Sequence, residues 1–235
     1  MIRENKYPVL DVICPQNVLV SVFDKAGLET VTDAVLSVNP SARFYSTGGT
    51  GEKIKAILGG EKVLQNYMSV EEFTGAPEME GGLVKTLHPK IHAGLLAERN
   101  NPAHETYLRE TMAKMGNGPG VYFDIFIGNL YPFVKVTSEE GANAETARVN
   151  IDIGGPTMTM AAAKNWHSVA VVTSPNQYFM FASSLTEKQG VNLEQRFALA
   201  QEALFLIGEY RRSIGYYFGH LNYESEIKPS IKMQK

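Results

Sequence analysis

The runs NVLVSVFD at residues 17–24 and ARFYSTGGT at residues 42–50 decide the fold that the sequence predicts. Both are rich in β-branched or aromatic residues at their start, which is typical of buried strands. Between them, Leu28, Val31 and Val35 recur at helical spacing. A strand, a helix and a second strand in this order predict two parallel strands joined by a covering helix.

The same alternation continues along the rest of the chain. We expect a weak third strand at 62–65, a long loop at 67–90, and two more strands at VYFDIFIGNL (121–130) and SVAVVT (168–173). Helices are expected at 102–115, 143–149, 156–164 and 193–218. The predicted fold class is α/β, with a doubly wound, mostly parallel sheet and a C-terminal helical extension. The expected organisation is an N-terminal extension at 1–16, one domain at 17–220 and a tail at 221–235.

The amino-acid composition excludes several classes of function for this protein. The 235 residues are 44% hydrophobic and 20% charged, with a net charge of −3, which argues against a sequence-independent nucleic-acid binder. The single cysteine, Cys14, excludes an intramolecular disulfide and favours a reducing compartment. No apolar run approaches the roughly 18 residues that a membrane span needs. We therefore expect a cytoplasmic protein that contacts neither membrane nor nucleic acid.

Two strand ends carry residue types that bind anions. Each strand passes into a helix, whose first N–H groups and partial positive charge attract a phosphate. Glycines let the backbone approach such a ligand closely. The structural alternative, a glycine-rich turn with Thr50 as helix cap, is equally compatible with the second end alone. The candidate residues are Ser21, Asp24 and Lys25 at the first end, and Ser46, Thr47, Gly48, Gly49 and Thr50 at the second.

Three further segments carry groups suited to acid–base chemistry, each with a structural alternative. Lys85 lies in the 67–90 loop, where a lysine is usually a solvated charge. Tyr131 follows the strand at 121–130, where it presents a hydroxyl at the rim of the sheet or plugs a turn. Asp152 and Lys164 bracket a predicted helix, whose dipole alone favours a carboxylate at its start and a lysine at its end.

Taken together, these segments resemble the cyclohydrolase domain of the bifunctional AICAR transformylase/IMP cyclohydrolase family. The matching blocks occur in the family's order and cover roughly residues 17–220. They are SVxDKxGL (21–28), STGGT (46–50), FTGxPEM (73–79), VKTLHPKIHAG (84–94), NLYPF (129–133), IDIGG (151–155) and AAAKN (161–165).

The resemblance implies a fold like that of methylglyoxal synthase and a defined reaction. The implied substrate is 5-formamidoimidazole-4-carboxamide ribotide (FAICAR), which would be cyclised to IMP with loss of water, without a metal or organic cofactor. The resemblance also implies a homodimer. Because the chain ends at Lys235, before any transformylase region, we expect a separate transformylase to supply FAICAR.

The resemblance further implies roles for particular residues. The family's catalytic positions correspond to Lys85, Tyr131, Asp152 and Lys164. Asp152 and Lys164, as a coupled pair, would orient and deprotonate the carboxamide, whereas Lys85 and Tyr131 would donate to the formyl oxygen. The expected substrate-binding residues are Ser21, Asp24, Lys25, Ser46, Gly48, Gly49, Thr50, Thr86, Asn129, Ile153 and Gly154.

Two departures from the family pattern keep alternatives open. Leu83 stands where the family has an arginine near the phosphate, and Lys53 is a candidate to replace it. Trp166 follows Asn165 where the family has a histidine, so that histidine's role is not transferred to His167. The alternatives are a methylglyoxal synthase-type phosphate lyase, a non-enzymatic nucleotide sensor of the same fold, and a cyclohydrolase that has lost its activity.

Overall fold

The computed structural model describes residues 4–231, and its centre is a five-stranded parallel sheet. The strand order is β4-β3-β2-β5-β6, and every neighbouring pair is parallel. The strands are β2 (Asn17–Val22), β3 (Arg43–Ser46), β4 (Tyr67–Ser69), β5 (Ile125–Asn129) and β6 (Ala170–Val172). The predicted α/β class and parallel sheet are confirmed.

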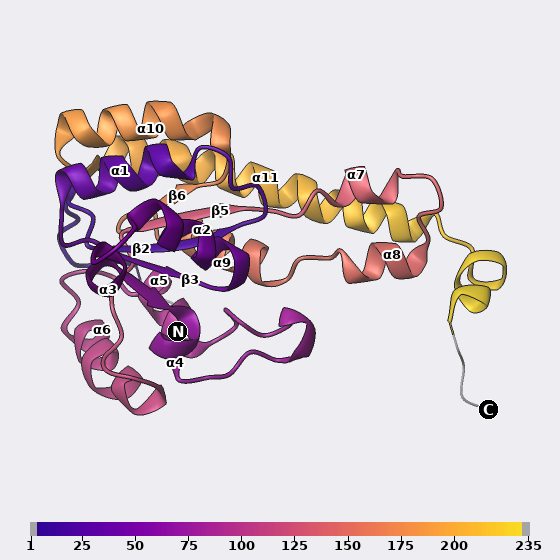
Figure 1. Ribbon diagram of the computed structural model, residues 1–235, viewed down its shortest axis with the longest axis horizontal. Helices are drawn as coiled ribbons and strands as arrows, with labels where there is room; N and C mark the ends of the chain where they lie inside the picture. Colours follow the sequence, from indigo (N-terminus) through magenta and orange to yellow (C-terminus); the bar gives the residue numbers. More distant parts are fainter. Residues whose placement is uncertain (1–3, 232–235) are drawn as a thin grey trace.

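Helices cover both faces of the sheet, as doubly wound connections require. On one face α1 (Leu28–Val38) packs against α2 (Gly48–Leu58) and α10 (Pro175–Lys188). On the other face α5 (Pro89–Leu96) packs against α9 (Gly154–Lys164). Figure 1 shows α1 and α10 side by side. The shorter helices are α3 (Lys62–Asn66), α4 (Val70–Thr74) and α6 (Pro102–Thr106), with irregular helical turns at Glu80–Gly82, Tyr107–Thr111, Met112–Met115, Tyr223–Ile227 and Lys228–Ser230.

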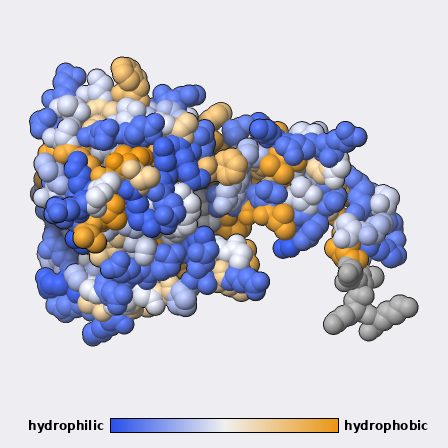
Figure 2. Space-filling view, viewed as in Figure 1, coloured by the Kyte–Doolittle hydropathy of each residue, from blue (hydrophilic) through white to orange (hydrophobic). Residues whose placement is uncertain are grey.

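A long C-terminal helix, α11 (Leu193–Gly219), confirms the predicted extension. It packs on α9 and β6 and then projects beyond the sheet, where α7 (Phe133–Thr137) and α8 (Ala144–Val149) lie beside it (Figure 1). Hydrophobic side chains gather along one side of this projection (Figure 2). Within residues 4–231, no helix is both long and apolar enough to cross a membrane.

A buried arginine fixes the start of α11. Arg196 is fully buried, and its guanidinium donates only to backbone carbonyls, which satisfies a charge that would otherwise be costly inside the protein. Two of these carbonyls belong to the N-terminal segment, which therefore belongs to the folded body. The segment's short strand β1 (Val12–Ile13) pairs with β7 (Val191–Asn192). The accepting carbonyls are those of Leu10, Asp11, Trp166, His167 and Val191.

The strand expected at residues 62–65 is wrong. These residues form α3, and the strand comes next, at Tyr67–Ser69. Gly59 and Gly60 have φ values of 63° and 47°, which let the chain turn directly into a short helix. The Asn66 side chain then donates to two carbonyls near β3, at 2.8 Å each. Residues 1–3 and 232–235, parts of the expected extension and tail, lie outside the described residues.

Candidate functional site

The start of α2 presents backbone donors at the carboxyl edge of the sheet. β3 ends at Ser46 and α2 begins at Gly48, so the helix start directly follows a strand end. The first N–H groups of an α-helix have no partner within the helix, and the side chain of the N-cap residue Thr47 accepts no hydrogen bond from them. Gly48 has a φ of 48°, a left-handed conformation that favours glycine. The helix start is therefore open to an anion.

Two lysines lie beside these glycines. A Cβ built on Gly48 would lie 3.1 Å from Lys85 Nζ, and one built on Gly49 would lie 3.7 Å from Lys25 Cε. Lys85 Nζ forms an ion pair with Glu78 at 2.5 Å. Two cationic side chains next to an open helix start give the charge and the donors that a phosphate group requires. We call Gly48, Gly49, Lys25 and Lys85 the phosphate cradle.

The hydroxyls expected to assist the cradle have structural partners instead. Ser46 is fully buried, and its hydroxyl donates to the Val20 carbonyl at 2.7 Å. The Thr50 hydroxyl donates to the Val22 carbonyl at 2.9 Å, and Thr50 lies inside α2 rather than at its cap. Both side chains therefore connect β3 and α2 to β2. The backbone N–H of Thr50 belongs to the open helix start. Ser46 contributes to the cradle only by holding the end of β3 against β2.

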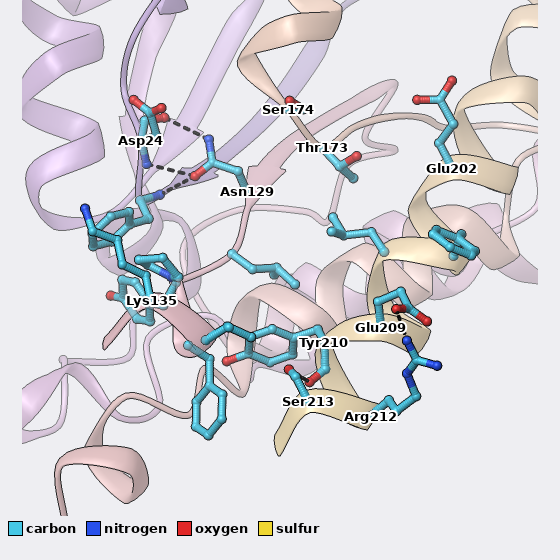
Figure 3. Close-up of a pocket in the computed structure, with 18 of the residues that line it drawn as sticks. Asp24, Asn129, Lys135, Thr173, Ser174, Glu202, Glu209, Tyr210, Arg212 and Ser213 are labelled. Carbon is cyan, nitrogen blue, oxygen red and sulfur yellow. Dashed lines mark hydrogen bonds and ion pairs between the residues drawn. The ribbon is translucent and has the colours of Figure 1, made fainter. Parts of the chain in front are cut away.

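The first strand end is shaped by Asn129, the last residue of β5. Its side-chain oxygen Oδ1 accepts from the N–H groups of Phe23 and Asp24 at 2.8 Å each, and its side-chain NH2 donates to the Asp24 carbonyl at 2.8 Å (Figure 3). The Asp24 carboxylate accepts from the Ala26 N–H at 2.9 Å. Asn129 and Asp24 thus hold the turn that carries Lys25. Ser21 is partly buried near the end of β2, opposite Gly128.

Asp152 lies immediately before α9, at the same edge of the sheet. Its carboxylate accepts from the Gly155 N–H at 3.0 Å. Burial raises the pKa of Asp152 above its ordinary value of 3.8, against the opposing effect of the Gly155 and Gly154 N–H groups. Within residues 4–231, no lysine or arginine forms an ion pair with it. A carboxylate with a raised pKa and no cationic partner is suited to act as a general base.

Thr86 connects Asp152 to the cradle. It is buried, and a Cβ built on Gly154 would lie 2.7 Å from its hydroxyl oxygen. Thr86 directly follows Lys85, so the start of α9 contacts the segment that delivers the cradle lysine. Ile153, beside Asp152, is exposed. The open helix start, two lysines and a partly buried carboxylate therefore share one edge of the sheet.

Tyr131 lies at the rim, where the site meets a large groove. Its ring is 46% exposed and packs edge-on against Phe23, with centroids 5.2 Å apart. The groove has a volume of about 2180 Å³ and runs from Lys25 and Tyr131 along α7 and α11 (Figure 3). Tyr131 is thus partly exposed at the rim of the sheet, and its role stays a prediction.

The expected pair of Asp152 and Lys164 does not form. Gly154 and Lys164 are the first and last residues of α9, and a rise of 1.5 Å per residue separates the two ends by about 15 Å. Lys164 is exposed at the end of α9 remote from Asp152. Lys53, the candidate replacement for the family arginine, instead forms an ion pair with Glu29 of α1 at 3.6 Å.

Two residues near the site were not identified from the sequence. Glu78, which binds Lys85, lies within the FTGxPEM block, whose match was the available signal. Tyr210 of α11 accepts a hydrogen bond from the Asp152 N–H at 2.8 Å, and nothing in the helical pattern distinguishes it from a core residue. In the described part of the chain, no three His, Cys, Asp or Glu side chains gather in a way that could hold a metal ion.

Comparisons with known proteins identify relatives of this chain. Residues 162–235 match the family model described as AICARFT/IMPCHase bienzyme. The bifunctional purine biosynthesis protein PurH of Natranaerobius thermophilus is 38% identical over 216 residues, which are 92% of this chain and 39% of that protein. PurH of Magnetococcus marinus is 44% identical over 172 residues, which are 73% of this chain and 30% of that protein.

A solved structure, the crystal structure of ForH, matches with a TM-score of 0.67 and 26% identity. It covers 87% of this chain, and the match includes all of the ForH chain. The chain spans less than two fifths of the length of the curated relatives it matches. The sequence identity, the family-model match and the shared fold together show that the chain belongs to the AICARFT/IMPCHase bienzyme family.

Proposed function

We propose that the protein cyclises FAICAR to IMP with release of water. The observation that carries this proposal is the contact between the start of α9 and the Lys85–Thr86 segment, through Gly154 and Thr86. This contact joins a partly buried carboxylate, which pairs with no lysine or arginine of residues 4–231, to a phosphate cradle at one edge of the sheet. Ligands of doubly wound proteins bind at this edge. A nucleoside monophosphate offers a phosphate group to the cradle and a base with exchangeable protons to the Asp152 carboxylate.

The phosphate of the nucleotide would bind at the start of α2. The N–H groups of Gly48, Gly49 and Thr50 would donate to its oxygens, with the ammonium groups of Lys25 and Lys85 beside it. Lys85 would then exchange Glu78 for the phosphate or the formyl oxygen. The base of the nucleotide would lie over Thr86, Ile153 and Gly154.

The ring closure needs one bond to form and one molecule of water to leave. The carboxamide nitrogen attacks the formyl carbon, and the formyl oxygen leaves with one proton from the carboxamide and one from the formamido nitrogen. Because an amide nitrogen is a poor nucleophile, holding the two groups in contact supplies much of the acceleration. Asp152 would accept the carboxamide proton, and Lys85 and Tyr131 would donate to the oxygen as it gains charge.

The residues described here account for cyclisation alone. The preceding formyl transfer is proposed to occur on another active site, which delivers FAICAR to this one. Homodimer formation stays a prediction from the sequence.

Incubation of the purified protein with FAICAR, without folate or metal, tests the proposal. We expect IMP, followed by chromatography and mass, to form well above the rate without protein. Saturable IMP binding without any turnover would contradict the proposal and favour the nucleotide-sensor alternative. Release of inorganic phosphate from a triose phosphate would favour the phosphate-lyase alternative.

A further inference from the structure

The distal half of α11 carries a tyrosine into the site described above. Tyr210 is 8% exposed and belongs to a small cluster with Phe133 of α7 and Ala147 of α8. Its ring lies edge-on to Phe133, with centroids 6.4 Å apart. In Figure 3 it projects from α11 across the groove, whereas Glu209 and Arg212 lie on another side of the helix and pair with each other.

The Tyr210 hydroxyl has one specific partner. It accepts the hydrogen bond of the Asp152 N–H at 2.8 Å, across 58 residues of sequence. Burial, together with the nearby Asp152 carboxylate, raises the pKa of the Tyr210 phenol above 10.0. The phenol therefore stays protonated at neutral pH, and its oxygen remains a neutral acceptor.

Asp152 is thus held from two directions. Its carboxylate is bound by α9, through the Gly155 N–H. Its main chain is bound by α11, through Tyr210. A partly buried N–H that loses its acceptor has a substantial free-energy cost, which the turn can relieve only by moving. Such a movement would also displace the carboxylate.

We propose that Tyr210 is a positioning residue that holds the Asp152 turn in the orientation needed for proton transfer. The inference rests on the proposed function, because it assigns Asp152 the role of base. It gives α11 a part in the chemistry: the helix that projects beyond the sheet fixes the geometry of a carboxylate at the sheet's edge. The hydroxyl acts through Asp152 and need not contact the substrate.

The chain offers a matched control for this hydroxyl. Tyr217, two turns further along α11, also packs edge-on against Phe133, with centroids 5.9 Å apart. Its hydroxyl makes no hydrogen bond within residues 4–231. Tyr217→Phe and Tyr210→Phe therefore remove the same atom from the same cluster, but only the second change frees the Asp152 N–H.

The test combines a kinetic and a structural readout. We expect Tyr210→Phe to lower kcat for FAICAR at least about tenfold, with KM changed less than about threefold, while Tyr217→Phe behaves as wild type. Amide hydrogen exchange should show that the Asp152 N–H exchanges about tenfold faster in Tyr210→Phe, with the sheet amides unchanged. Melting temperatures of the two variants monitor their stability.

The two readouts separate failure of this inference from failure of the proposed function. If wild type cyclises FAICAR and Tyr210→Phe keeps its kcat, the positioning role is wrong. If wild type does not turn over FAICAR, the proposed function fails, and hydrogen exchange alone decides whether Tyr210 holds the turn. Unchanged Asp152 exchange in Tyr210→Phe overturns the inference in either case.

Discussion

Asp124 is buried and Asp152 is partly buried, and the two lie at opposite edges of the sheet with different binding partners. Asp124 immediately precedes β5, and its carboxylate accepts from the Gln16 and Asn17 N–H groups at 2.7 Å each and pairs with Arg99. Asp152 precedes α9, and within residues 4–231 its carboxylate accepts only from backbone N–H groups at the start of that helix. At the amino edge, both oxygens of the Asp124 carboxylate are already bound within the protein. At the carboxyl edge the Asp152 carboxylate has no cationic partner among residues 4–231.

The different partners of the two carboxylates indicate a structural role for Asp124 and a catalytic role for Asp152. Burial raises the pKa of both carboxylates, against the opposing effect of the donors that bind them. The two differ in what already occupies them. The Asp124 carboxylate binds a guanidinium and two N–H groups and stabilises the junction of β2 and β5, whereas the Asp152 carboxylate pairs with no lysine or arginine of residues 4–231 and can take a proton from a ligand. The comparison therefore predicts that changes at Asp152 alter turnover and changes at Asp124 alter stability.

The largest effect is expected from Asp152→Asn. The amide keeps the shape and the hydrogen bond to Gly155, but it cannot accept a proton. We expect kcat for FAICAR to fall by about a hundredfold or more, measured as IMP formation at saturating substrate. IMP binding and melting temperature should stay close to wild type. Near-normal turnover would end the assignment of Asp152 as base.

Asp124→Ala should produce the reverse result. It leaves the Arg99 guanidinium and two part-buried N–H groups without their acceptor, so we expect a loss of about 3 kcal/mol in the free energy of unfolding. Urea denaturation followed by circular dichroism measures this loss. At a temperature where the variant is folded, kcat should match wild type. A catalytic defect without a stability defect would break the comparison.

The pH profile sharpens the comparison further. Because the pKa of Asp152 is raised above 3.8, the carboxylate loses its charge at a higher pH than an ordinary aspartate does. The base is active only when deprotonated, so kcat/KM should fall as pH decreases through this raised value. Initial rates from pH 4 to 8 measure this fall in kcat/KM. A profile that stays flat down to pH 4 would contradict the raised pKa.

The smallest effect is expected at the cradle. Leu83 is 65% exposed and stands where the family has an arginine. Leu83→Arg should lower KM for FAICAR by about tenfold, because an exposed charge-assisted hydrogen bond falls at the low end of the range of about 1.5–3 kcal/mol. Leu64→Arg, an exposed position on α3, adds the same charge elsewhere and should leave KM unchanged. Equal effects of both variants would point to general electrostatic attraction.

Much of the fold could be predicted from local pattern. The strands at 17–24 and 121–130 and the helix from residue 193 follow from apolar runs and helical spacing that the core then buries. The strand at 67–69 was missed because three partly buried residues carry too little pattern, and only pairing with β3 makes them a strand. The N-terminal strand was missed for the same reason.

The site was predicted less completely, for a physical reason. Motif matches locate backbone features well, and the glycines of α2 and the turn at Asp152 lie where the sequence placed them. Side-chain partners depend on tertiary contacts. The Ser46 and Thr50 hydroxyls bond to β2, the length of α9 keeps Lys164 from Asp152, and Tyr210 arrives from a helix 58 residues later in the chain.

The most direct test of the central claim is a crystal structure of Asp152→Asn with FAICAR bound. We expect the phosphate on the N–H groups of residues 48–50 with Lys25 and Lys85 beside it, and the carboxamide nitrogen within hydrogen-bonding distance of the side chain at position 152. FAICAR bound in the groove along α7 and α11, with its carboxamide away from position 152, would contradict the claim that the carboxyl edge is the site of ring closure.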